Sequence, residues 1–123
     1  METPTEFVRE WLNRICTNDP EEITSLYKDD AVLLGTLDPK VRQGTTEIGD
    51  YFKHFVTLRP HGTITYLIDA GIAHETLAVV NGTYVFELTE AGKTVTVPAR
   101  FTFVLERTGP KWLILSHHSS KEP

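Results

Sequence analysis

Cysteine is nearly absent from this sequence, since Cys16 is the single cysteine among 123 residues. One cysteine cannot form an internal disulfide or a cysteine-clustered zinc site. Its place on the apolar side of a helical pattern favours a buried, unreactive thiol over a nucleophile. The sequence also lacks a glycine-rich phosphate loop and a Gly-x-Ser-x-Gly nucleophile motif, so it gives no sign of phosphate binding or serine-hydrolase chemistry.

The sequence lacks an excess of basic residues and any long apolar run. Seventeen acidic residues against twelve basic ones give a formal net charge of −5, which argues against nucleic acid or an anionic membrane as a partner. No apolar run approaches the roughly 20 residues that cross a bilayer, and the acidic N-terminus is unlike a signal peptide. We therefore expect a soluble, cytoplasmic protein.

The composition that remains is that of a globular domain. Hydrophobic residues make up 40% of the chain and charged residues 24%, and 123 residues are an ordinary domain length. We find no repeat, low-complexity segment or linker. The sequence therefore predicts a single domain over residues 1–123.

Helical signals dominate the first half of the chain. Thr3 and Pro4 begin a capping-box pattern, with apolar residues at helical spacing behind it. Pro20 and the hydroxyl of Thr45 mark the starts of two further helices. Between these two helices, we expect a turn at residues 29–30, and the short apolar run at residues 31–34 predicts a strand.

Strand signals fill the second half, because β-branched and aromatic residues dominate it. The predicted strands are residues 63–68, 72–80, 83–88, 94–107 and 112–118. Asn81 and Gly82 are expected to interrupt the strand pattern as a turn or a break. Helices at one end and strands at the other predict an α+β fold, with three N-terminal helices packed on a curved antiparallel sheet around a pocket.

The histidines do not have the spacing of a metal site. The chain has His54, His61, His74, His117 and His118, and none forms a two-ligand pair at helical spacing. The adjacent pair at the end of the last strand points to opposite faces of the sheet. We therefore expect no metal, and we expect no cofactor.

Five residues are candidates for binding a ligand. Arg100 lies in mid-strand. It either pairs with an acidic residue at the rim of the sheet or points into the predicted pocket to hold a carboxylate. His118 shares a strand face with Trp112 in simple alternation, and is either a surface residue or part of the pocket wall. Tyr51 and Tyr66 offer polar tips, although such tyrosines more often pack in a core.

The order of three motifs resembles the nuclear-transport-factor-2-like superfamily over essentially the whole chain. The motifs are Tyr27–Val32, the stretch from Val41 to Phe52, and Gly109–Ser120. The resemblance, which extends to SnoaL-like proteins, implies a cone-shaped, cystatin-like α+β fold.

Within that superfamily, the sequence looks most like the association (hub) domain of calcium/calmodulin-dependent protein kinase II and its stand-alone bacterial relatives. Trp112, His118 and Ser120 match the hub's last strand, while Gly82-Thr83-Tyr84 and the segment from Pro98 to Phe103 match strands of the bacterial relatives. The resemblance implies assembly through the outer face of the sheet and a pocket between helices and sheet.

The chain departs from its relatives at positions that matter for chemistry. Counting back from Trp112 places Phe103 where the hub has a pocket arginine, and Arg100 stands three residues earlier. Ketosteroid isomerases are also similar, but their catalytic base falls on Gly35 and their oxyanion tyrosine on Trp11. That isomerisation needs both a base and a donor, so we do not expect it.

Self-association is also predicted from the residues themselves. Phe101 and Phe103 alternate with Thr102 and Val104, so both faces of the sheet are partly apolar, and three helices can cover only one. The leading hypothesis is a homo-oligomeric association domain, not itself a kinase, that binds a small anionic ligand.

The alternative hypothesis is a pocket enzyme of isomerase, dehydratase or cyclase type. His118 or His54 would act as the general acid or base, and Arg100 would hold a carboxylate of the substrate. A weaker alternative is an adaptor that binds a partner protein and no ligand.

Overall fold

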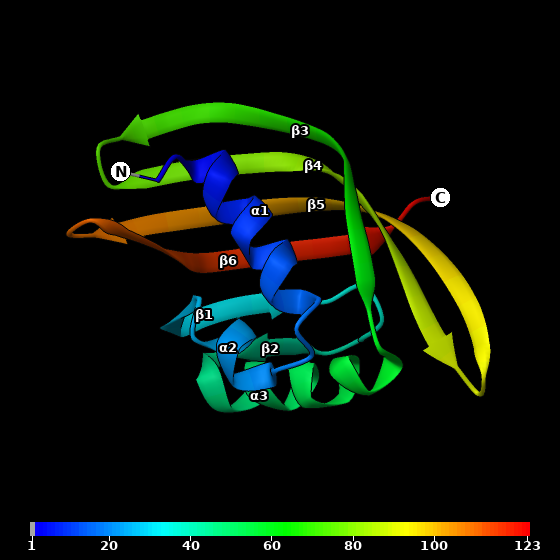
Figure 1. Ribbon diagram of the computed structural model, residues 1–123. Coiled ribbons are helices and arrows are strands. Elements are labelled where there is room, and N and C mark those ends of the chain that lie inside the picture. The colour runs from blue at the N-terminus through cyan, green and yellow to red at the C-terminus, as the bar shows by residue number, and fades with distance from the viewer. Residues whose placement is uncertain (1) are drawn as a thin grey trace.

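The computed structural model describes residues 2–123, except for the side chains of residues 69–74. Figure 1 shows helices on one side of a strongly curved sheet, which confirms the predicted α+β class. The elements are α1 (Pro4–Ile15), α2 (Pro20–Thr24), β1 (Tyr27–Leu34), β2 (Val41–Gln43), α3 (Gly44–Phe55), the 3-10 helix η1 (Val56–Leu58), β3 (His61–His74), β4 (Leu77–Glu90), β5 (Lys93–Thr108) and β6 (Lys111–Lys121).

The strands form one six-stranded sheet in the order β2-β1-β6-β5-β4-β3. Strands β3 to β6 follow one another as antiparallel neighbours. β1, however, pairs with β6 in parallel, so the predicted antiparallel sheet includes one parallel pair. The cause is the path of the chain: β1 and β6 are joined by all the intervening elements and not by a hairpin turn.

The helices begin where their local chemistry favours a start. Thr3 Oγ1 accepts a hydrogen bond of 3.2 Å from the backbone N–H of Glu6, and the Glu6 carboxylate accepts one of 3.0 Å from the N–H of Thr3. This confirms the predicted capping box. The third helix begins at Gly44, whose φ of 84° suits glycine, and not after a Thr45 cap. In the described part of the chain, no helix is both long and apolar enough to cross a membrane.

The core lies between the helices and the inner face of the sheet. From the sheet, alternate side chains of β5 are buried in this core, Phe101 and Phe103 among them. From the helices, the face of α1 that carries Trp11 is buried in it. Helix α3 packs against β1. The predicted burial of alternate residues in the long strand is thereby confirmed.

The strand boundaries between residues 60 and 90 differ from the prediction. Instead of three strands there are two, and the chain turns at Glu75 and Thr76, not at Asn81 and Gly82. Gly82 lies in mid-strand because an added Cβ would come within 2.3 Å of the backbone oxygen of Tyr66. The backbone at residue 72, where we predicted a strand to begin, belongs to β3, and its side chain lies outside the described residues.

The first strand and its partner were also predicted incompletely. Asp29 and Asp30, expected in a turn, belong to β1, which begins at Tyr27. The short strand β2 pairs with the end of β1 and was not predicted. Three residues carry too little pattern to be recognised as a strand.

Two strands extend beyond the rest of the sheet. β3 pairs with β4 only from Glu87 inward, and β6 pairs with β5 only as far as Ala99. Residues 88–95 therefore pair only with each other, and we call this two-stranded segment the arm. Figure 1 shows the arm bending away from the sheet (yellow).

Candidate functional site

A narrow crevice lies between the helices and the inner face of the sheet. Its volume is about 390 Å³, including its open mouth, but the centre of a water molecule can occupy only about 20 Å³ of it. That is room for one or two waters. The lining residues are Trp11, Leu33, Gly35, Thr36, Leu37, Tyr51, Phe52, Phe55, Tyr84, Phe86, Leu88, Val97, His117 and Ser119.

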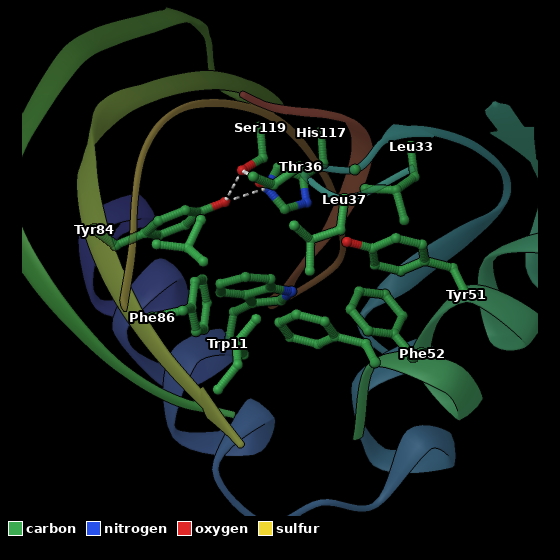
Figure 2. A pocket seen from close by; sticks show the side chains of 14 residues that line it. Trp11, Leu33, Thr36, Leu37, Tyr51, Phe52, Tyr84, Phe86, His117 and Ser119 are labelled. Carbon is green, nitrogen blue, oxygen red and sulfur yellow. Dashed lines mark hydrogen bonds between the residues drawn. The ribbon is translucent and has the colours of Figure 1, made fainter. Parts of the chain in front are cut away.

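The lining follows from the periods of the elements. Tyr84 and Phe86 are two residues apart on β4, and His117 and Ser119 are two apart on β6, so each pair faces inward. Figure 2 shows these strand side chains meeting Trp11 of α1 and the aromatic residues of α3. The crevice thus has aromatic sides and a polar strip along β6.

A chain of hydrogen bonds begins deep in the core. Trp11 Nε1 donates to Tyr27 Oη over 3.1 Å, and Tyr27 Oη lies 2.9 Å from His117 Nδ1. The imidazole of His117 stacks on Phe103, with ring centres 3.9 Å apart, and meets the edge of the Trp11 ring at 5.1 Å. These contacts fix the orientation of His117.

The same chain continues to the wall of the crevice. His117 Nε2 lies 3.3 Å from Tyr84 Oη, and Tyr84 Oη donates to Ser119 Oγ over 2.6 Å. Ser119 Oγ is hydrogen-bonded in turn to Thr36 Oγ1. Figure 2 shows the Tyr84, His117, Ser119 and Thr36 side chains converging. We call the six residues the hydrogen-bond chain: Trp11, Tyr27, His117, Tyr84, Ser119 and Thr36.

The crevice carries no net charge at neutral pH. Burial, with a smaller effect of His118, lowers the pKa of His117 to about 3, so its imidazole is neutral. Burial raises the pKa of Tyr51 to about 12 and that of Tyr84 further, so both phenols stay protonated. No Asp, Glu, Lys or Arg is among the lining residues.

Charged groups gather only at the mouth. A second depression shares Leu37, Tyr51 and Phe55 with the crevice and is also lined by Asp38, Arg42 and His54. There Arg42 Nε lies 2.6 Å from Asp38 Oδ2. Burial raises the pKa of the Asp38 carboxyl, but the hydrogen bonds and the charge of Arg42 outweigh it, so the net shift of this pKa is downward. The opposite charges of Arg42 and Asp38 therefore cancel.

The structure brings only one of the five predicted ligand-binding residues into the crevice. Tyr51 lines it, half-buried. Arg100 and His118 are exposed on the outer face of the sheet, so the expectation that they point into the cone is wrong. Arg100 alternates with the buried side chains of Ala99 and Phe101, and this alternation turns its guanidinium outward.

The remaining candidates lie elsewhere. Tyr66 is 61% exposed on β3, and Trp112 is buried in the core outside the crevice lining, where its Nε1 donates to the backbone oxygen of Glu2 over 3.0 Å. His54 is exposed at the mouth. The side chain of His74 lies outside the described residues.

Sequence reasoning missed His117 because β6 contains a bulge. The pairing with β5 shifts register between Val104 and Leu105, opposite residues 114–116 of β6. Simple alternation from Trp112 puts His118 inward, but the extra residue reverses the faces. The neighbouring His117 and Ser119 therefore face the crevice. A one-residue bulge leaves no clear mark in this strand's sequence.

Comparison with known proteins identifies relatives along nearly the whole chain. Residues 4–123 match the family model described as calcium/calmodulin dependent protein kinase II association domain. A crystal structure described as such a domain from Xanthomonas campestris is 38% identical, with a TM-score of 0.91 over 97% of this chain and 85% of that chain.

More distant structures share the fold. They include a protein from Novosphingobium aromaticivorans that is described as a scytalone dehydratase (11% identity, TM-score 0.82, 94% and 79% covered). Another is a ketosteroid isomerase-like protein from Erwinia carotovora (18% identity, TM-score 0.76, 94% and 92% covered). Two further structures of similar fold are described as cystatin-like. No curated protein matches the chain. The predicted resemblance is thereby confirmed: this chain belongs to the calcium/calmodulin-dependent protein kinase II association domain family.

Proposed function

We propose that this chain is a homo-oligomeric association domain that assembles through the outer face of its sheet. The observation that carries the proposal is that apolar side chains remain partly exposed on this face, while the helices cover the inner one. An uncovered apolar face of this kind marks an interface. These outer-face side chains are Val32, Tyr66, Ile68, Val79, Val85, Val104 and Leu113.

The polar groups on the same face are suited to burial. Thr102 Oγ1 donates to Asn81 Oδ1 over 2.5 Å, and the hydroxyls of Thr65 and Thr83 are 2.8 Å apart. A polar group that already has a partner costs less to remove from water than an unpaired one. A second copy can therefore cover these four polar side chains with little penalty.

Native mass spectrometry of charged variants tests the oligomer. Ile68 is 45% exposed on the outer face, so Ile68→Lys leaves the core intact and should turn the oligomer into a monomer. Val41→Lys is the matched control, because Val41 is 60% exposed on β2 and does not lie on the proposed interface. A wild type that is monomeric at micromolar concentration would contradict the proposal.

A second proposed function is that the crevice binds a small molecule. It supports binding because it combines aromatic walls with a few convergent polar groups. Filling the mouth by Leu37→Trp should then abolish ligand-induced shifts of the Trp11 indole resonance. Ligand-induced shifts that survive in this variant would argue against the crevice.

Acid–base catalysis has weaker support. Gly35 and Trp11, which stand at the isomerase's catalytic positions, do line the crevice but cannot exchange a proton. His117 is neutral, and both of its ring nitrogens are engaged. His118 lies on the opposite face of the sheet. A general base needs to reach the reacting proton, so binding without catalysis is the function we favour for the crevice.

A further inference from the structure

The hydrogen-bond chain has a fixed direction. An indole nitrogen only donates, so Tyr27 Oη accepts from Trp11 and its own hydrogen is free for His117 Nδ1. A neutral imidazole that accepts at Nδ1 carries its hydrogen on Nε2, which then donates to Tyr84 Oη. We assign this tautomer because the other would set two lone pairs against each other at Tyr84, whose hydrogen goes to Ser119.

The hydrogen-bond chain has one more donor hydrogen than it has hydrogen bonds, and the extra hydrogen lies at the crevice wall. Ser119 Oγ accepts from Tyr84, so the hydrogen of Ser119 and the hydrogen of Thr36 both remain. These two hydroxyls form one bond with each other, and one bond uses one hydrogen. The second hydrogen has no partner among the residues that the structure describes. The wall therefore offers a hydrogen-bond donor, whichever of the two hydroxyls holds it.

The surroundings of this donor restrict what it can bind. An ionised group would lie among uncharged lining residues without a counterion, which is costly. A neutral acceptor such as a carbonyl oxygen would satisfy the free hydrogen. Leu37 is the one lining side chain classed as exposed, so it can move aside to admit a ring between Trp11, Tyr51 and Phe86.

We propose that the crevice takes an uncharged aromatic molecule bearing a carbonyl-type acceptor, which accepts a hydrogen bond from the Ser119–Thr36 hydroxyl pair. This inference rests on the second proposed function and deepens it. It replaces the anionic ligand expected from the sequence, since Arg100, the residue meant to hold a carboxylate, points away from the crevice.

Three probes of similar size test the ligand class on the wild-type protein. Acetophenone is neutral with an acceptor, ethylbenzene is neutral without one, and benzoate is charged. Binding is followed by the Trp11 indole Nε1–H cross-peak of the ¹⁵N-labelled protein, which a Trp112→Phe sample assigns. We expect acetophenone to bind about three- to tenfold more tightly than ethylbenzene, and benzoate to bind at least about tenfold more weakly than acetophenone.

The outcomes separate the two levels of the proposal. Benzoate binding more tightly than acetophenone would overturn the neutral-ligand class and leave binding in the crevice standing. Equal affinities for acetophenone and ethylbenzene would overturn the hydrogen bond. No shift with any of the three probes would overturn both this inference and the second proposed function.

Two variants of Thr36 locate the donor. Thr36→Val leaves the hydrogen of Ser119 free, because Ser119 Oγ still accepts from Tyr84, so this variant should keep the three- to tenfold preference for acetophenone over ethylbenzene, about the worth of one hydrogen bond. Thr36→Asp supplies a carboxylate that has no hydrogen of its own and accepts that of Ser119, so it should lose the preference. A preference lost in Thr36→Val or kept in Thr36→Asp would overturn the assignment, and the probe series on the wild type decides the case if Thr36→Asp does not fold.

Discussion

At the scale of single residues, His117 explains how a titratable group sits in the core without charge. It stacks on Phe103 and has a hydroxyl neighbour on each ring nitrogen, Tyr27 at Nδ1 and Tyr84 at Nε2. Protonation would leave a cation in an apolar layer, and Nδ1 would lose its ability to accept. The depressed pKa of His117 is the consequence of this packing.

The buried imidazole should make the protein less stable in mild acid. The pKa of His117 is about 3 in the folded chain against an ordinary value of 6.5, so between these values the unfolded chain binds more protons. Its contribution is fully present above pH 6.5 and is lost as the pH falls toward 3. The free energy of unfolding should fall by about 1.4 kcal/mol per pH unit over this window.

Urea unfolding between pH 6.5 and 5 measures this slope, above the range in which most carboxylates titrate. His117→Gln should flatten the slope, whatever it does to stability at pH 7. His118→Gln changes the exposed neighbour and should leave the slope as it is in wild type. A wild-type slope that His117→Gln leaves unchanged would refute the assignment.

At the scale of elements, the arm is the least supported part of the sheet. Residues 88–95 pair only with each other, and an isolated two-stranded ribbon is marginally stable. Yet Leu88 and Val97, at the base of the arm, line the crevice. The wall formed by these two residues is thus attached to the segment that opens most easily.

Hydrogen exchange should reveal this difference in local stability. We expect the paired backbone amides of the arm, in residues 88–90 and 93–95, to exchange at least about tenfold faster than those of residues 78–86, which lie between two strands. Equal protection in the arm and in residues 78–86 would show that the arm is held by contacts other than its own pairing.

Elements with strong local signals were predictable from the sequence, and those set by distant contacts were not. The capping box at Thr3 and the alternation around Phe101 identified α1 and β5. Gly82 was wrongly predicted to interrupt a strand. Its role is to admit the backbone of Tyr66 on the neighbouring strand β3, which no local pattern reveals. The resemblance implied a pocket between helices and sheet, but the polar residues of the crevice could not be predicted, since a bulge in β6 decides that His117 faces inward.

At the scale of the whole molecule, one sheet separates the two proposed functions onto opposite faces. The crevice uses inward residues such as His117, and the interface uses outward ones such as Val104. Neighbours along a strand point to opposite sides, so each face can change without altering the side chains of the other.

The two functions should therefore be separable by mutation. Ile68→Lys, on the outer face, should remove the oligomer but keep acetophenone affinity within about twofold, because sites without shared partners behave additively. The Thr36→Asp protein should keep the mass of the wild-type oligomer in native mass spectrometry. Loss of both properties in either variant would show that the faces are coupled.

The parallel pairing of β1 with β6 also determines when the sheet can be completed during folding. The β3–β6 meander closes through short hairpin connections, whereas the contact between Tyr27 and His117 spans 90 residues of chain. Closing so long a loop costs entropy before any contact repays it. We expect the meander to form the folding nucleus. Docking of β1, and with it assembly of the hydrogen-bond chain, would follow the rate-limiting barrier, so the crevice would be among the last features of the protein to form.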